Sequence, residues 1–180
     1  MSTAFAPASI ESLVRPHGSF WTPAELHDLV SSVGIHHRSA LLAQVRFASP
    51  QRWWSRLALT EEVEVWLLSW LPGQHTEPHD HGGASGAFSV VLGTLSETYR
   101  YPGSPVGQRT HELGSTIGFG AGRAHQVWNR SLEKTATVHA YSPPLVPTRE
   151  YDSLWDLPAS IPPLPPRRSL EDLQKEPVEP

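Results

Sequence analysis

The spacing of apolar residues divides the chain into two parts of different texture. Within residues 1–47 apolar positions recur three and four apart, most clearly in residues 24–33, which is the period of an amphipathic helix. Thr22 followed by Pro23 is a typical helix start, and Ser9 precedes a shorter apolar stretch at residues 10–14. We therefore predict two or three short helices over residues 1–47.

From residue 53 to residue 141 the pattern changes to short apolar and β-branched runs between glycine-rich turns. Runs at residues 63–68, 88–92 and 135–139 are of strand length, and together they predict an antiparallel barrel or jelly roll. The stretch from residue 157 onward is rich in proline and then charged, which predicts an extended or disordered tail. The expected organisation is a helical segment (1–47) packed on a mainly β domain (48–156), followed by a proline-rich tail (157–180).

Charge and hydropathy exclude several classes of partner. Fourteen basic and eighteen acidic residues are interspersed, with a net charge of −4, so nothing in the pattern predicts binding to nucleic acid or to an anionic membrane. No apolar run approaches the roughly 20 residues of a membrane span, and residues 1–10 lack the pattern of a secretory leader. We expect a cytoplasmic protein, present as a monomer or a weak homo-oligomer.

The absence of cysteine narrows the possible chemistry. It excludes disulfides, iron–sulfur clusters, thiolate zinc sites and a cysteine nucleophile. Ten histidines remain as possible nitrogen ligands and general bases. The question is which of them come together.

The sequence His79-Asp80-His81 lies in a region that reads as strand. Side chains two residues apart on a strand share a face, so both imidazoles can reach one ion while Asp80 points the other way. By itself this pair is equally compatible with two surface or hydrogen-bonded histidines.

The spacing around that pair resembles the two motifs of the cupin superfamily. In the first motif, Gly73 is followed by five residues, His79-Asp80-His81 and then Gly93; in the second, Gly114 is followed by five residues, Gly120-Ala121-Gly122, two residues, His125, three residues and Asn129. The resemblance implies a cupin jelly-roll barrel in which His79, His81 and His125 hold one metal ion. Gly120 replaces the proline usual at its position, which affects a turn and not a ligand.

Gly86 stands where many cupins have a glutamate ligand. Three neutral imidazoles leave the charge of the ion uncompensated, and an octahedral ion would keep three adjacent positions open. Such a site attracts anionic donors such as a thiolate, whose deprotonated form the ion stabilises. Three histidines also suit zinc, so the ligands alone do not select iron.

From about Arg52 to about Asp152 the chain more specifically resembles the type I cysteine dioxygenases. The marks are Trp70 nine residues before His79, the segment Ala-His-Gln-Val-Trp-Asn at residues 124–129 and the segment Thr-Val-His-Ala-Tyr-Ser-Pro-Pro at residues 137–144. The resemblance implies a mononuclear non-haem Fe(II) enzyme that converts L-cysteine and O2 to cysteine sulfinic acid. It also implies a cis bond between Ser142 and Pro143. Some members link the active-site tyrosine to a cysteine at the position of Gly86, which this chain cannot do.

The resemblance also implies roles for individual residues. An arginine near the first strand clamps the substrate carboxylate; Arg56 is the matching residue and Arg52 is the alternative. Thr137, His139 and Tyr141 alternate along one strand and so share a face, where they correspond to the family's Ser-His-Tyr triad. Tyr141 would present its hydroxyl to the bound oxygen or substrate, while His139 and Thr137 hold it in place.

Other interpretations of these residues remain open. The substrate can be another small thiol such as 3-mercaptopropionate, or the protein can be a non-catalytic zinc-binding, sensor or partner-binding cupin. His139 and Tyr141 can be ordinary buried residues and Arg56 a surface arginine. We expect the remaining histidines to be solvated (His17, His27, His36, His37 and His111), His75 to lie at the rim, and the tryptophans to fill the core or the cavity wall (Trp66, Trp70 and Trp128).

Overall fold

The computed structural model describes residues 8–166, and within this range three α-helices precede the strands: α1 (Ala8–Leu13), α2 (Pro23–His36) and α3 (Arg38–Gln44). The start of α2 is as predicted, because the Thr22 hydroxyl accepts from the backbone N–H of Glu25 while the Glu25 carboxylate accepts from Thr22. Ser9 lies inside α1 and not ahead of it. None of the helices in residues 8–166 is long and apolar enough to cross a membrane.

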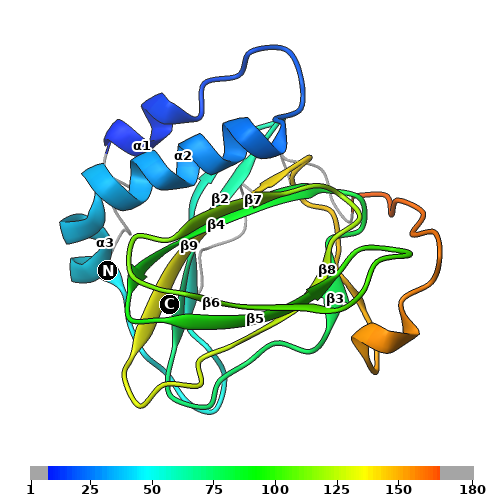
Figure 1. The fold of residues 1–180 in the computed structure, drawn as a ribbon. Coiled ribbons are helices and arrows are strands. Elements are labelled where there is room, and N and C mark those ends of the chain that lie inside the picture. The colour runs from blue at the N-terminus through cyan, green and yellow to red at the C-terminus, as the bar shows by residue number, and fades with distance from the viewer. Residues whose placement is uncertain (1–7, 167–180) are drawn as a thin grey trace.

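The strands form two five-stranded antiparallel sheets that face each other (Figure 1). The first sheet has the order β1-β2-β9-β4-β7 and the second β10-β3-β8-β5-β6. Their bounds are β1 (Trp54–Leu59), β2 (Glu64–Trp70), β3 (His79–Asp80), β4 (Ser85–Leu92), β5 (Leu95–Arg100), β6 (Gly107–His111), β7 (Thr116–Phe119), β8 (Ala124–Trp128), β9 (Thr135–Ser142) and β10 (Arg149–Glu150). The predicted mainly β cupin barrel with short N-terminal helices is confirmed.

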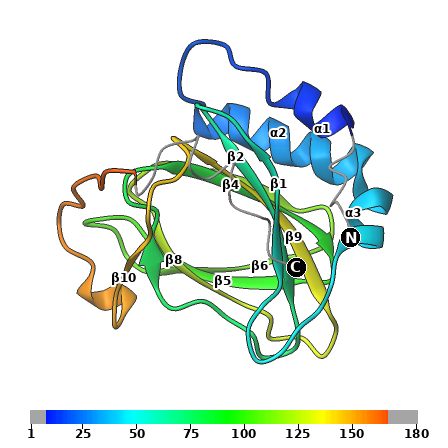
Figure 2. The ribbon, with the colours of Figure 1, turned by 180° about the vertical axis from the view of Figure 1, so that it is seen from behind.

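The helices cover the outer face of the first sheet, as both views of the ribbon show (Figures 1 and 2). The apolar face of α2 is buried there through Leu26, Leu29, Val30 and Val33. Gly118 of β7 lies against the backbone at the start of α2, where a Cβ atom would have no room. This packing supplies the largest of the three apolar clusters in residues 8–166 and leaves the inner face of the sheet free for other residues.

Strand register decides which residues face the inside of the barrel. In β2 and β9 the opposed pairs Glu64–Tyr141, Trp66–His139 and Leu68–Thr137 alternate with the buried apolar pairs that face the helices. The polar members therefore line the interior next to an apolar cluster that contains Trp70, Phe88 and Phe119.

After β9 the chain passes the Ser142–Pro143 bond, which is cis as predicted, and reaches a short 3-10 helix, η1 (Leu154–Asp156). The described part of the proline-rich segment is extended. It lies against the turn that follows β3, where the Leu164 N–H donates to the Gly82 carbonyl at 2.7 Å. The rest of the predicted tail, residues 167–180, lies outside the described residues.

Candidate active site

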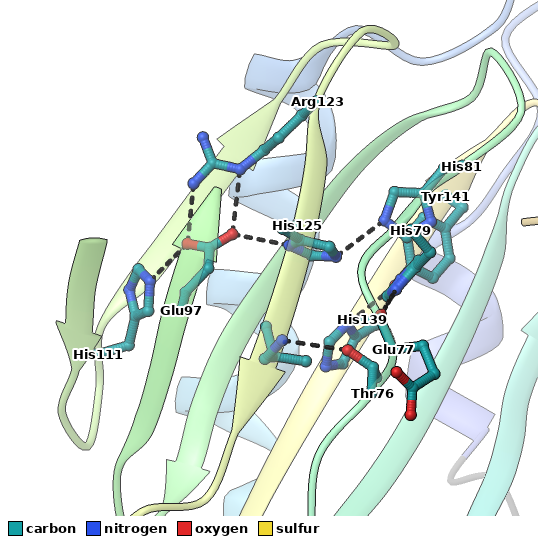
Figure 3. Close-up of polar contacts among 11 residues, drawn as sticks. Thr76, Glu77, His79, His81, Glu97, His111, Arg123, His125, His139 and Tyr141 are labelled. Atoms are coloured by element: carbon teal, nitrogen blue, oxygen red, sulfur yellow. Dashed lines mark hydrogen bonds and ion pairs between the residues drawn. The ribbon is translucent and has the colours of Figure 1, made fainter. Parts of the chain in front are cut away.

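The structure brings His79, His81 and His125 together inside the barrel. One ligand nitrogen from each residue lies within 4.8 Å of the others, and the Nε2 atoms of His81 and His125 are 3.1 Å apart (Figure 3). His79 and His125 are register neighbours on β3 and β8, and His81 follows β3 directly. Within residues 8–166 no other group of three His, Asp or Glu side chains has this geometry.

Burial keeps the imidazoles of His79 and His81 neutral and therefore able to bind a metal. It lowers the pKa of His79 to about 3, with a smaller contribution from His125, and holds the pKa of His81 well below its usual value. The Nδ1 atom of His79 lies 2.8 Å from the Glu77 carbonyl, which can only accept, so Nδ1 carries the proton and Nε2 is left for the ion. The donor set fits a divalent cation that accepts nitrogen ligands.

A buried carboxylate, Glu97, fixes His125 in the same way. Its Oε1 atom lies 2.7 Å from His125 Nδ1, and both carboxylate oxygens accept from Arg123, at 3.0 and 2.8 Å. His111 Nε2 lies 2.9 Å from Oε2, which completes the ring of donors around Glu97 in Figure 3. Burial alone would raise the pKa of Glu97, but the hydrogen bonds from His111, His125 and Arg123 outweigh it and lower the pKa.

This network corrects one prediction. His111 is only 3% exposed and paired with Glu97, so the expectation that it is solvated was wrong. Two features of the sequence are consistent with this network. Glu97 shares a strand face with Leu95 and Tyr99, two positions away on either side, which is an unusual place for a charged residue. Arg123 stands two positions before His125, on the same face.

The carboxylate that many cupins use has no room here. A Cβ atom on Gly86 would lie 2.5 Å from the Phe119 ring and 2.9 Å from Tyr141, so these two rings fill the position. Asp80 also takes no part. Its side chain accepts from Gly82, Arg149 and Tyr151, away from the imidazole cluster as the alternation predicted.

A hydrogen-bonded chain runs along β9. The Trp70 indole N–H donates to Thr137 Oγ1 at 2.9 Å, Thr137 Oγ1 is 2.8 Å from His139 Nε2, and His139 Nδ1 is 3.0 Å from the Tyr141 hydroxyl. Because Trp70 can only donate, the buried Thr137 hydroxyl finds an acceptor for its proton in His139 Nε2. His139 then carries its proton on Nδ1 and donates to Tyr141, which leaves the phenol O–H to point elsewhere.

This series of hydrogen bonds ends at Tyr141, beside the imidazole cluster. The Tyr141 and His81 rings are 4.6 Å apart between centroids. Burial, with a further contribution from the Glu64 charge, raises the pKa of Tyr141 above its usual value, so the phenol keeps its proton. The cavity therefore has a phenol O–H donor in its wall, on a ring that lies beside the imidazole cluster.

These groups line one cavity of about 210 Å³. Its walls include the three imidazoles, His139 and Tyr141, closed by Leu68, Trp70, Val127 and Val146. A volume of this size admits a small molecule and excludes a polymer. Trp70 and Trp66 belong to the wall as predicted, whereas Trp128 instead contacts His75 outside the cavity.

The two candidate arginines occupy different places. Arg52 lines the cavity, with its guanidinium 4.2 Å above the Trp70 ring and a buried Nη1 that has no hydrogen-bond partner. Arg56 lies 5.4 Å over the Trp66 ring and is not among the cavity-lining residues. The physical reason is position in the fold: Arg52 is in the segment before β1 that reaches the end of β2, while Arg56 is paired within an edge strand.

A known protein family matches this chain. The family described as "Cysteine dioxygenase type I" matches residues 27–154. The chain belongs to the type I cysteine dioxygenase family. Membership supports a cupin-type dioxygenase with a metal site, and it is consistent with the cluster of His79, His81 and His125.

Other similarities are weaker. Auxin-binding protein 4 of Zea mays is 35% identical over 105 residues (55% of this chain and 50% of that protein), and auxin-binding protein T85 of Nicotiana tabacum is 34% identical over 106 residues (54% of each). The chain thus spans about half the length of the curated relatives it matches.

Solved structures share the fold. A Bacillus halodurans protein superposes with a TM-score of 0.53 at 18% identity, covering 63% of this chain and 82% of that one. A Klebsiella pneumoniae protein with a double-stranded β-helix domain gives 0.51 at 18% identity, covering 63% and 95%.

Proposed function

We propose that this protein is a mononuclear non-haem Fe(II) dioxygenase that converts L-cysteine and O2 to cysteine sulfinic acid. The observation that carries the proposal is a three-imidazole cluster without a carboxylate, beside a small cavity lined by a tyrosine and by an arginine with one buried, unpaired guanidinium nitrogen. Both oxygen atoms go to the sulfur, which supplies all the electrons that O2 takes up, so no further reductant is needed.

Iron held by His79, His81 and His125 would supply Lewis acidity toward the thiol and redox chemistry toward O2. The chain's own contribution begins with charge. Neutral imidazoles leave the site cationic when it is loaded, and this favours the thiolate form of the substrate.

The position of Arg52 is the evidence that the substrate carries a carboxylate. A buried guanidinium nitrogen without a partner is costly, and a carboxylate would provide a charge-assisted acceptor. The Trp70 ring beneath the guanidinium limits its orientation, so the substrate would be held in one position relative to the imidazoles. We assign the clamp to Arg52 in place of Arg56.

Tyr141, held by His139 and Thr137, would orient the substrate and hold a proton. Thr137 sets the tautomer of His139, and His139 N–H donates to the Tyr141 oxygen, so the phenol O–H is free to donate into the cavity. The Tyr141 ring lies beside the His81 ring, so this proton could be donated to a polar atom of a substrate held in the cavity.

The test is oxygen consumption by protein loaded anaerobically with Fe(II), with L-cysteine and then 3-mercaptopropionate as substrate and with the sulfinate identified by mass spectrometry. We expect cysteine-dependent uptake that is lost in His81→Ala and lowered about tenfold or more, mainly through KM, in Arg52→Gln. Arg56→Gln is the matched control and should change KM much less.

Two results would reject the proposal in different ways. Faster turnover of 3-mercaptopropionate than of cysteine would reassign the substrate to another thiol. Tight iron binding without oxygen uptake on any thiol would favour a non-catalytic metal-binding or sensor cupin.

A further inference from the structure

A buried acid, Glu64, faces the same cavity and has no part in the function proposed above. It begins β2, opposite Tyr141 of β9, and is 7% exposed. Among the described residues that line the cavity it is the only acidic one, and Arg52 is the only permanently charged base. The cavity thus contains one fixed positive group and one carboxylate besides the imidazole cluster.

The carboxylate is held in place by the chain around it. Its Oε1 accepts from the backbone N–H of Leu145 at 3.1 Å, and Leu145 has a left-handed φ of 66°. The segment that follows contributes Val146 and Thr148 to the cavity wall. Glu64 is therefore anchored on one side by the backbone, so its position in the wall is defined before any ligand enters.

Burial raises the pKa of Glu64, while hydrogen bonds from Leu145 and Trp66 and the charge of Arg56 oppose that rise. Arg56 acts from outside the cavity lining. A carboxylate with so little access to water is stabilised by a hydrogen bond from an N–H group of a ligand. The same carboxylate repels a second carboxylate placed close to it.

We propose that Glu64 is a specificity-determining residue that selects thiols carrying an amino group, through hydrogen bonds from that group to its carboxylate. The inference rests on the proposed thiol dioxygenase function and extends it to the substrate class. A thiol with both an amino group and a carboxylate has partners for both Glu64 and Arg52. A thiol with a carboxylate alone leaves Glu64 buried without a ligand partner.

The test compares L-cysteine, cysteamine and 3-mercaptopropionate in the wild type, Glu64→Gln and Glu61→Gln. Glutamine keeps the shape and the acceptor for the Leu145 N–H but removes the charge. In Glu64→Gln we expect the preference in kcat/KM for cysteine over 3-mercaptopropionate to fall about tenfold or more, mainly through KM for the two aminothiols. Glu61 is an exposed acid in the turn before β2, and its substitution should leave the preference unchanged.

A purely structural role for Glu64 would lower turnover of all three thiols by the same factor, and this result would overturn the inference. Anaerobic calorimetry of the same thiols on Co(II)-loaded protein separates the two proposals, because it needs no turnover. No oxygen uptake combined with aminothiol binding that weakens selectively in Glu64→Gln would reject the dioxygenase and retain the selectivity. Equal affinities in the wild type and Glu64→Gln would reject the selectivity.

Discussion

Two buried histidines on opposite walls of the cavity have partners of opposite character. His125, on β8 of the second sheet, is held by the Glu97 carboxylate, which Arg123 and His111 also contact. His139, on β9 of the first sheet, is held between two hydroxyls, those of Thr137 and Tyr141. Both rings are almost completely buried, at 1% and 2% exposure.

The difference matches two kinds of chemistry. An anionic partner keeps the proton on Nδ1 and makes the lone pair of Nε2 more basic, which suits a metal ligand. Neutral hydroxyl partners orient a ring without adding charge, which suits a group that sets the direction of a tyrosine proton. The second sheet therefore supplies the charged support of a proposed metal ligand, and the first sheet supplies the neutral hydrogen-bonded residues of the proposed relay.

The strongest test of this comparison removes each ring. His125→Ala deletes one of the three proposed metal ligands, so we expect more than about a hundredfold loss of metal affinity and no measurable activity. His139→Ala should keep the metal and lose turnover. Metal content after desalting is measured on both variants beside the oxygen assay. Equal metal loss in the two variants would contradict the assignment of His125 to metal binding and of His139 to the relay.

Glu97→Gln tests the anionic partner. It removes the charge that supports His125 and leaves buried Arg123 without its counter-ion, so we expect metal affinity to fall by about tenfold to a hundredfold. Competition titration with a chromogenic chelator measures the affinity. Thr137→Val is the matched control on the opposite wall, and it should bind metal as the wild type does.

Thr137→Val should instead lower kcat about tenfold. It deprives the Trp70 N–H of its acceptor and no longer dictates which nitrogen of His139 carries the proton. Thr137→Ser should restore most of the rate, since it returns the hydroxyl. An unchanged kcat in Thr137→Val, with the metal fully bound, would show that the relay does not act in turnover.

The smallest effect is on the stability of the metal-free protein as a function of pH. The pKa of His79 is about 3 in the folded state, below its ordinary value, so only the unfolded chain takes up a proton there as the pH falls below about 6.5. Stability should therefore decrease from pH 7.5 to 5.5, by about 1 kcal/mol for His79. Glu97, whose pKa is lowered in the folded state, reduces the stability further only when the pH falls below the ordinary pKa of a glutamate.

Chemical denaturation at the two pH values measures this effect. His79→Asn should have a shallower dependence on pH than the wild type. A wild-type stability that does not change over this interval would contradict the neutral, buried state of the His79 imidazole.

The sequence by itself determined the parts that depend on local periodicity. Alternation along a strand places Thr137, His139 and Tyr141 on one face. The glycine and histidine spacing resembles the two cupin motifs, and this resemblance implies that His79, His81 and His125 form a set. Thr22 and Pro23 likewise predict the start of α2, because a cap depends on residues that are neighbours in the chain.

Tertiary structure alone decided which charged side chains reach these residues. Arg52 and Arg56 both stand near the first strand in the sequence, and only the path of the segment before β1 puts Arg52 against Trp70 and in the cavity. Glu97, His111 and Arg123 meet because β5 pairs with both β6 and β8, and Glu64 faces Tyr141 because β2 pairs with β9. Such contacts depend on strand pairing between distant segments, and local periodicity carries no information about which strands become neighbours.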